Sequence, residues 1–314
     1  MNNSILYSFL FVIFSTLISI NIFYHISKKI NLIDKPNFRK NHEGDIPLVG
    51  GLSILISLIA FIFIFDQPYY IDVIIFVSLL ILLVGIYDDI YQSSITIRIL
   101  IQFIASILII ILGLKITTLG EYFYFGNIQT GYFGIILTLI FVVGLTNSIN
   151  FIDGLDGLAA GIVLLGIINL FIFSFLTNPI LNFELFTFLI ISLLIFIIFN
   201  LGYFKNKKIF LGDSGSTTLG FILGWFLVYY SHPSNNNLDP SLTIWCVSIP
   251  VFDLLALLII RFKNNKNPLH PDHNHIHHTL LRLKFSQKKV LTTILCLSVL
   301  LSLIGYLSYY YFGS

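Results

Sequence analysis

Strongly apolar stretches alternate with short polar gaps along almost the whole chain. Ten stretches are long enough to cross a bilayer as helices, which takes about 20 residues. The predicted spans cover roughly residues 4 to 25, 47 to 65, 70 to 87, 97 to 114, 132 to 149, 157 to 177, 182 to 201, 216 to 231, 241 to 261 and 290 to 312. The expected fold is an all-α, polytopic integral membrane protein with about ten transmembrane helices in one domain over residues 1–314.

Composition places the chain in the same class. Hydrophobic residues make up 57% of it and charged residues 10%, which leaves too few polar side chains for the surface of a soluble domain. The net charge of +2 is small and its basic residues are spread over several loops, so we expect no nucleic-acid partner. Cys246 and Cys296 both lie inside predicted spans and show no metal-ligand spacing.

The basic residues predict the orientation in the membrane. All Lys and Arg residues except Lys115 fall in alternate gaps between the spans, and the positive-inside rule assigns those gaps to the cytoplasm. No Lys or Arg precedes the first span, whereas Lys28 and Lys29 follow it directly, so we expect a retained anchor with its N-terminus outside. Ten spans return the C-terminus to that side of the cell inner (plasma) membrane.

The inner gaps also hold the densest clusters of Asp, Asn and His, which makes them the expected catalytic loops on the cytoplasmic face. The first contains a basic cluster, Arg39, Lys40 and His42, beside a proline and shortly before paired glycines. Such a cluster can hold a phosphate, and it is equally typical of an ordinary positive-inside loop.

The second inner gap places two adjacent carboxylates, Asp88 and Asp89, at the end of a span and Arg98 at the start of the next one. Adjacent carboxylates are costly there unless a divalent cation or a basic partner accompanies them. This pattern favours a functional site over a simple cap at the end of a helix.

The third inner gap carries four polar residues at three-residue spacing, Asn147, Asn150, Asp153 and Asp156, with two glycines among them. A helical continuation would place these groups near one face, and the glycines would permit close approach of a ligand. A plain turn also favours Asn, Asp and Gly, but it does not need four such groups in register.

The fourth inner gap sets Asp213 between two glycines, before a run of Ser and Thr that opens a helix. Backbone amides at a helix N-terminus suit a phosphate, and the carboxylate suits Mg²⁺ or Mn²⁺. The alternative is an ordinary capped helix start.

The fifth inner gap has five His within residues 270–278, including His275, His277 and His278. This density can indicate zinc, but no Cys accompanies it and the aspartates elsewhere favour a hard, oxygen-bound cation. Histidine can instead bind a pyrophosphate or transfer protons.

Together these motifs resemble those of the polyprenyl-phosphate N-acetylhexosamine-1-phosphate transferase family (glycosyltransferase family 4), most closely its bacterial undecaprenyl-phosphate GlcNAc-1-phosphate branch. The resemblance spans roughly residues 34 to 284 and rests on five ordered segments: 34–42, 88–89, 147–158, 212–216 and 275–278.

The resemblance implies transfer of N-acetylhexosamine-1-phosphate from a UDP-sugar to a polyprenyl (undecaprenyl) phosphate. The reaction releases UMP, forms a polyprenyl-pyrophosphate-sugar and initiates cell-surface glycan synthesis. The implied partners are a UDP-N-acetylhexosamine, the lipid phosphate and the membrane, and the implied cofactor is Mg²⁺, with Mn²⁺ as a substitute. A homodimer is compatible with the sequence, which does not set the oligomeric state.

The resemblance also implies roles for single residues. Asp213 is the expected metal ligand together with Asn150, Asp88 is expected to activate the lipid phosphate, and Asp89 is a supporting acid. The remaining catalytic candidates are His277 and His278; the substrate-binding candidates are Arg39, Lys40, His42, Arg98, Asn147, Asn150, Asp153, Asp156, Asn200 and His275.

Three other protein classes share some of these features. A phospho-MurNAc-pentapeptide transferase belongs to the same superfamily, but the basic first loop and the His-rich loop look more like the GlcNAc branch. A secondary transporter should concentrate its polar groups at the bilayer midplane and in paired repeats. A CDP-alcohol phosphotransferase should show its own spaced-Asp motif, which this chain lacks. The sequence does not name the sugar or the pathway, and of the one-step and phospho-enzyme mechanisms we favour one-step attack.

Overall fold

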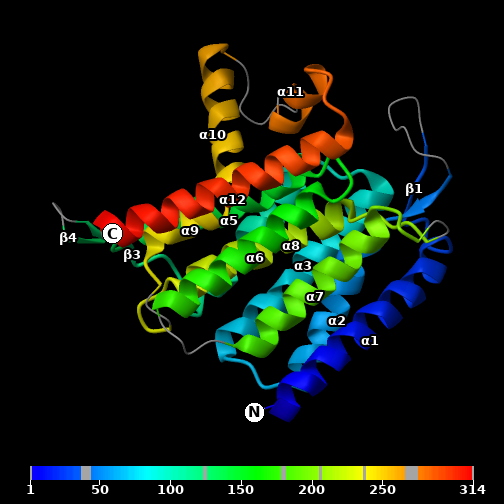
Figure 1. Cartoon of the computed structure of the whole chain (residues 1–314), viewed down its shortest axis with the longest axis horizontal. Helices are drawn as coiled ribbons and strands as arrows, with labels where there is room; N and C mark the ends of the chain where they lie inside the picture. The colour runs from blue at the N-terminus through cyan, green and yellow to red at the C-terminus, as the bar shows by residue number, and fades with distance from the viewer. Residues whose placement is uncertain are drawn as a thin grey trace.

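The computed structural model describes residues 2–36, 44–122, 126–177, 182–204, 207–235, 238–265 and 275–312. Within these ranges the chain forms twelve helices and two small antiparallel sheets (Figure 1). The helices are α1 Asn2–Ser27, α2 Gly50–Ile62, α3 Tyr69–Tyr91, α4 Ile95–Ile111, α5 Phe133–Ile152, α6 Leu158–Thr177, α7 Phe183–Asn200, α8 Gly212–Tyr230, α9 Pro240–Cys246, α10 Ser248–Lys263, α11 Ile276–Arg282 and α12 Gln287–Phe312. Strand β1 (Ile33–Asp34) pairs with β2 (Ile46–Pro47), and β3 (Thr118–Tyr122) pairs with β4 (Gly126–Gln129).

Helix α8 forms the centre of the bundle. Every residue from Ser214 to Tyr230 is buried, and α8 packs most extensively against α3 and α5. Its first turns consist of Gly, Ser and Thr, which let neighbouring backbones approach closely, as small residues do between membrane helices. Gly51 of α2 packs directly on Gly215, and Gly85 of α3 packs on Ser214. The start of α8 is therefore held tightly between α2 and α3.

The contact between Gly51 and Gly215 predicts that adding one methyl group at residue 51 lowers the stability of the protein. A Cβ atom on Gly51 would lie 2.0 Å from the Cα atom of Gly215, so Gly51→Ala should force the two helices apart and cost about 1–3 kcal/mol or more. We expect a lower thermal unfolding midpoint in detergent. Gly144→Ala is the matched control, because its Cβ would lie 3.7 Å from Leu254. Equal midpoints for the two variants would contradict this packing.

The helices confirm an all-α, multi-pass membrane protein but correct the number of spans. Each predicted window coincides with a helical segment, yet only six helices in the described ranges are long and apolar enough to cross a membrane: α1, α3, α5, α6, α7 and α12. Helices α2 and α4 are shorter, and α8 begins with polar residues. Counting α9 and α10 as one span gives seven, so the expectation of ten was too high by this criterion.

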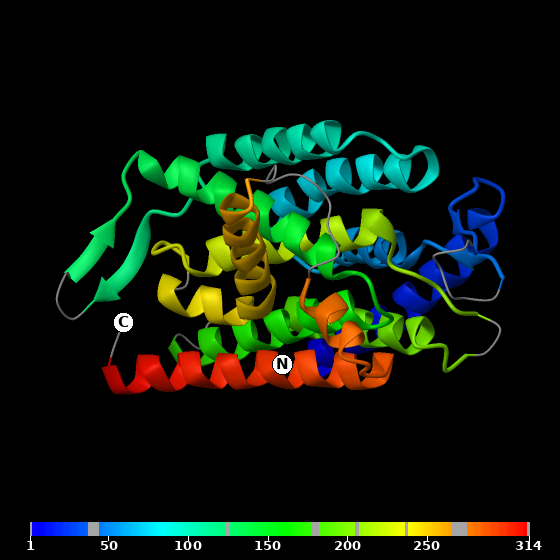
Figure 2. The same cartoon turned by 90° about the horizontal axis from the view of Figure 1, so that it is seen from above.

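The predicted span over 241–261 is not a straight helix. It is divided into α9 and α10, which are bent by 84° at a short break, and α10 leaves the bundle and stands apart from it (Figure 1). Pro250 explains the break, because it has no N–H group to donate to the Cys246 carbonyl and so cannot continue the α9 ladder. In the view from above, α10 is seen obliquely, crossing over the other helices (Figure 2).

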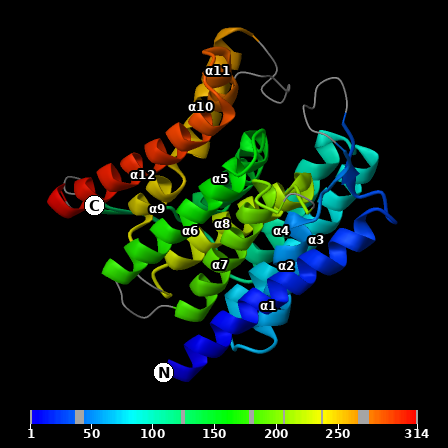
Figure 3. The same ribbon diagram turned by 45° about the vertical axis from the view of Figure 1, so that its right-hand side comes forward.

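The two ends of the bundle carry different elements. Helices α1 and α12 run so that the N- and C-termini lie toward one end, while β1 and α11 lie at the other end (Figure 3). Which side of the membrane each end faces stays a prediction.

Candidate active site

A cavity of about 1020 Å³ lies at the β1 and α11 end of the bundle. Its wall combines Leu48 with residues within 31–35, 88–98, 153–156, 200–213 and 281–287. All five inner gaps of the sequence therefore contribute to one cavity. Seven of the candidate site residues line it: Asp88, Asp89, Arg98, Asp153, Asp156, Asn200 and Asp213.

Arg98 joins two of the aspartates. Helix α3 ends before Gln92, which has a positive φ of 55°, and Ser94 then caps α4. This tight turn brings Arg98, in the first turn of α4, back toward the end of α3. Its Nη1 atom donates to Asp88 Oδ2 at 2.6 Å and to Asp213 Oδ2 at 2.9 Å.

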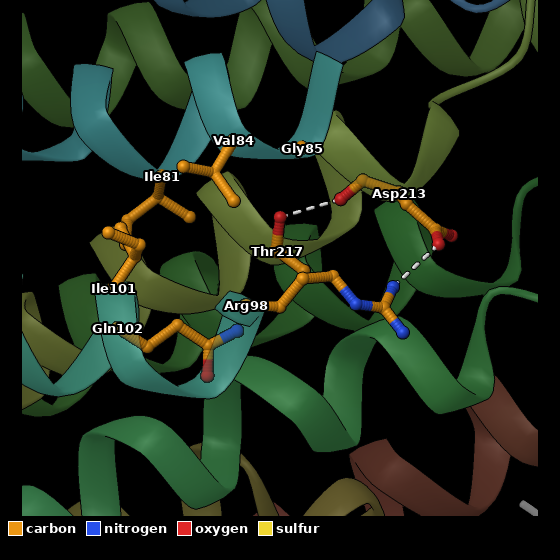
Figure 4. A pocket seen from close by; sticks show the side chains of 8 residues that line it. All are labelled: Ile81, Val84, Gly85, Arg98, Ile101, Gln102, Asp213 and Thr217. Carbon is orange, nitrogen blue, oxygen red and sulfur yellow. Dashed lines mark hydrogen bonds and ion pairs between the residues drawn. The ribbon is translucent and has the colours of Figure 1, made fainter. Parts of the chain in front are cut away.

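The surroundings of the two aspartates differ. Asp88 is only 7% exposed, and its second oxygen accepts a hydrogen bond from Ser93 Oγ at 2.8 Å. The Asp213 side chain keeps 47% of its surface exposed. Figure 4 shows the Arg98 guanidinium directed at Asp213, while the Thr217 hydroxyl donates to the Asp213 carbonyl. Asp213 is therefore fixed in position and still accessible to a ligand.

Asp89 holds the start of α8. Its carboxylate accepts hydrogen bonds from the backbone N–H groups of Asp213 (2.9 Å) and Ser214 (3.1 Å), two donors that the helix itself leaves unsatisfied. Gly212 has a φ of +77°, and a Cβ atom there would lie 2.7 Å from Asp89 Oδ2. Asp89 thus positions Asp213, and it also lines the cavity.

The two asparagines of α5 have different partners. The side-chain amide of Asn150 donates to Asp213 Oδ1 at 3.1 Å and to Ser216 Oγ at 2.9 Å, so this candidate metal ligand touches the other one. Asn147 pairs with Gln102 of α4, to which it donates at 2.6 Å. Asn147 is not among the described residues of the cavity wall, and its role in substrate binding stays a prediction.

Asn200 and Lys208 link the third and fourth inner gaps. Asn200 accepts from the Gly157 N–H at 2.6 Å and donates to the Ile209 carbonyl at 2.9 Å. The Lys208 ammonium lies 2.6 Å from Asp156 Oδ2. From the sequence, Lys208 was interpreted only as a positive-inside residue that sets the membrane orientation. Its position five residues before Asp213 could have indicated that it lies near the site. Lys208 adds a further cation to the wall of the cavity, which also contains Arg98 and Lys35.

The pKa of Asp153 is raised well above its ordinary value. Desolvation, followed by the charges of Asp213, Asp89 and Asp156, raises the pKa of Asp153 to about 8. Repulsion among these carboxylates is what a bound cation would relieve.

The raised pKa of Asp153 predicts a pH-dependent stability. An unfolded Asp titrates near pH 4, so the folded, metal-free protein should lose stability as the pH rises from about 4 through about 8. We expect the thermal midpoint of wild-type protein in EDTA to fall across this range and that of Asp153→Asn to fall less. Asp66→Asn, in the loop between α2 and α3 where Asp66 is exposed, is the control. Parallel profiles for wild type and Asp153→Asn would contradict the prediction.

The donor atoms at the cavity fit a hard divalent cation. Asp213 offers an accessible carboxylate, Asn150 an amide, and the nearby aspartates further oxygen atoms, which are the ligands that Mg²⁺ prefers. In the described ranges, no three His, Cys, Asp or Glu side chains already converge to hold a metal. Part of the ligand set would thus come from other groups, such as amide, phosphate or water oxygens.

The histidines of α11 lie beside this wall. His275 and His277 are buried, and the His277 ring packs so closely on Gly154, which lines the cavity, that a Cβ atom there would lie 2.5 Å from His277 Nε2. The His277 and His278 ring centres are 4.1 Å apart. The basic candidates of the first inner gap, Arg39, Lys40 and His42, lie outside the described residues.

These features define a polytopic membrane protein with an acidic, charge-paired site at one end of its helices. The chain belongs to glycosyl transferase family 4, whose family model matches residues 71–231, a range from α3 through α8. The resemblance that the motifs predicted is confirmed.

Individual relatives extend the similarity over most of the chain. It is 31% identical over 311 residues to the undecaprenyl-phosphate alpha-N-acetylglucosaminyl 1-phosphate transferase of Yersinia pestis, covering 97% of this chain and 83% of the relative. The protein of the same description from Escherichia coli (strain K12) is 33% identical over 291 residues, covering 91% and 78%. A probable undecaprenyl-phosphate N-acetylglucosaminyl 1-phosphate transferase of Bacillus subtilis is 31% identical over 302 residues, covering 95% and 83%.

Proposed function

We propose that this protein transfers GlcNAc-1-phosphate from UDP-GlcNAc to undecaprenyl phosphate. An oxygen of the lipid phosphate attacks the sugar-bearing phosphorus, the bond to the bridging oxygen breaks, and UMP leaves. The product is undecaprenyl-pyrophosphate-GlcNAc. The choice of sugar and lipid follows the descriptions of the relatives.

The observation that carries the proposal is the junction of Asp88, Arg98 and Asp213 in the wall of a large polar cavity. The junction lies where apolar helices end. A lipid phosphate can reach this position from the membrane while its chain stays in the bilayer, and a nucleotide sugar can reach it from water. Two polyanions that meet there need positive charge between them.

Arg98 is suited to supply part of that charge. Its guanidinium has five N–H donors, and the two contacts with aspartates both use Nη1. The remaining donors can bind phosphate oxygens without breaking the junction. Lys208 and Lys35 offer further positive charge on the same wall.

Asp88 is the proposed acceptor of the last proton of the lipid phosphate. Hydrogen bonds from Arg98 and Ser93 hold its carboxylate in one orientation. Because a phosphate monoester is already largely ionised near neutral pH, one-step attack does not require a phospho-enzyme intermediate. Asp213 and Asn150 would hold Mg²⁺, which when bound supplies charge neutralisation for the pyrophosphate.

The proposal is tested with purified protein, undecaprenyl phosphate and a panel of UDP-sugars in Mg²⁺. We expect UMP release with UDP-GlcNAc and a lipid product whose mass increases by one GlcNAc-phosphate unit. UDP-MurNAc-pentapeptide should give no product. Turnover of that substrate alone would favour the cell-wall transferase, and uptake of an intact UDP-sugar into proteoliposomes without cleavage would favour a transporter.

We also propose that the cavity faces the cytoplasm in the cell inner membrane, on the basis of the positive-inside pattern. In a cysteine-free background, an impermeant maleimide should label Gln129→Cys of β4 in intact cells. It should label Lys288→Cys, at the start of α12, only after permeabilisation. The reverse pattern would invert the orientation.

A further inference from the structure

An acidic residue outside the cavity holds the start of α11. Asp253 lies on α10, and its side chain is 9% exposed. Its Oδ2 atom lies 2.7 Å from His275 Nδ1, and its Oδ1 atom accepts a hydrogen bond from the Ile276 N–H at 2.9 Å. One carboxylate from α10 thus binds both the ring that precedes α11 and the first backbone amide of α11.

This contact fixes the orientation of the His275 ring. With Asp253 at Nδ1, that nitrogen carries the proton, as in histidines oriented by a carboxylate partner. The ring also lies near two others: its centre is 5.4 Å from that of Phe151, and 6.0 Å from that of His277, to which it is nearly parallel at 13°. The His275 ring therefore links Asp253 to His277.

His277 transmits this position to the cavity wall. Its ring packs against Gly154, the neighbour of Asp153, and against the ring of His278. Gly154 and Asp153 both line the cavity. A continuous series of contacts thus leads from Asp253 on the protruding α10 to the acidic wall.

We propose that Asp253 is a positioning residue for the transfer reaction, acting through His275 to hold His277 and His278 at the cavity. This inference rests on the proposed function. It predicts that the Asp253 carboxylate is the contact through which α10, which leaves the bundle, affects the position of the histidines at the site. A purely structural role would be to join α10 and α11 with no effect on the folded enzyme's rate.

The experiment compares Asp253→Ala, Asp253→Asn and His275→Ala with the double variant Asp253→Ala/His275→Ala. Glu121→Gln in the exposed hairpin is the control for loss of a carboxylate. The measurements are kcat, the KM for each substrate, the thermal midpoint, and hydrogen exchange in residues 276–282. Asp253→Asn has nearly the same shape, keeps one acceptor oxygen and can retain one of the two hydrogen bonds, so it remains informative if Asp253→Ala does not fold.

We expect Asp253→Ala to lower kcat/KM for UDP-GlcNAc by about 10- to 100-fold, a magnitude taken from the loss of carboxylates that orient metal-binding histidines. The KM for undecaprenyl phosphate should stay within about twofold of wild type, Asp253→Asn should keep more activity than Asp253→Ala, and the double variant should be no worse than the poorer single variant. Hydrogen exchange in α11 should accelerate in Asp253→Ala.

Two results would overturn the inference: folded Asp253 variants with wild-type kcat/KM, or effects of Asp253→Ala and His275→Ala that simply multiply. A failure of the proposed function would give a different result. The wild-type protein would then be inactive, while hydrogen exchange in α11 would still depend on Asp253. That outcome would support the contact between Asp253 and α11 and contradict the proposed reaction.

Discussion

Asp213→Asn should lower kcat by about 10³-fold or more while leaving the protein folded. The variant keeps the size of the side chain but removes the charge of the one aspartate at the Arg98 junction that remains 47% exposed. If that carboxylate holds the cation that neutralises the transferring phosphoryl group, its loss removes an interaction made mainly in the transition state. The KM values should therefore change much less than kcat.

The Asp213→Asn measurement needs a titration of Mg²⁺ and a matched control. Asp66→Asn makes the same chemical change at an exposed position between α2 and α3 and should keep wild-type kcat. If Asp213→Asn reaches near-normal turnover at any Mg²⁺ concentration, the metal must be held elsewhere, and Asp213 would be reduced to a partner of Arg98.

Arg98→Gln should have the second-largest effect, about 10²- to 10³-fold on kcat. It removes the cation that Asp88 and Asp213 share, at 2.6 and 2.9 Å. The thermal midpoint should also fall, because Asp88 is buried and loses its charged partner. Arg98→Lys should restore part of the activity, since an ammonium supplies the charge without the rigid fork of a guanidinium.

Lys115→Gln is the control for Arg98→Gln, since Lys115 is the single basic residue assigned to an outer gap and should not affect turnover. A kcat for Arg98→Gln within about threefold of wild type would show that the junction stabilises the fold without taking part in the reaction.

The common location of the polar loops could be predicted from the sequence because charge and hydropathy both report on the membrane. Asp88, Asp153 and Asp213 follow or precede apolar stretches on the side that carries the basic residues, and in the structure they line one cavity. The family followed from the same motifs. These inferences needed only the order of residues along the chain and the physics of the bilayer.

The contacts within the site could not be predicted in this way, because they depend on how each helix is rotated and where it bends. The motif spacing gave Asn147 and Asn150 equal status, but one pairs with Gln102 and the other with Asp213. Pro250 was visible in the sequence, but the 84° bend that it permits was not, and neither was the pairing of Asp253 with His275.

The lengths of the helices could be predicted only in part from the sequence. The window over residues 47–65 was apolar enough to predict a span, whereas α2 has 13 residues and ends at Ile62. The chain before it forms β2 and joins the segment that precedes α8, with Phe210 donating to the Pro47 carbonyl at 2.8 Å. The residues around Pro47, which hydropathy alone assigned to a helix, instead pair with other parts of the chain.

The most direct test of the proposed reaction follows the β-phosphate of the donor. UDP-GlcNAc labelled with ³²P at that phosphate is incubated with the protein, undecaprenyl phosphate and Mg²⁺, and the lipid and aqueous phases are separated. Transfer of GlcNAc-1-phosphate predicts label in the lipid phase and unlabelled UMP in the aqueous phase, and Asp213→Asn should give neither. Labelled UDP in the aqueous phase, with unlabelled sugar on the lipid, would mean that the enzyme transfers the sugar alone and would contradict the account.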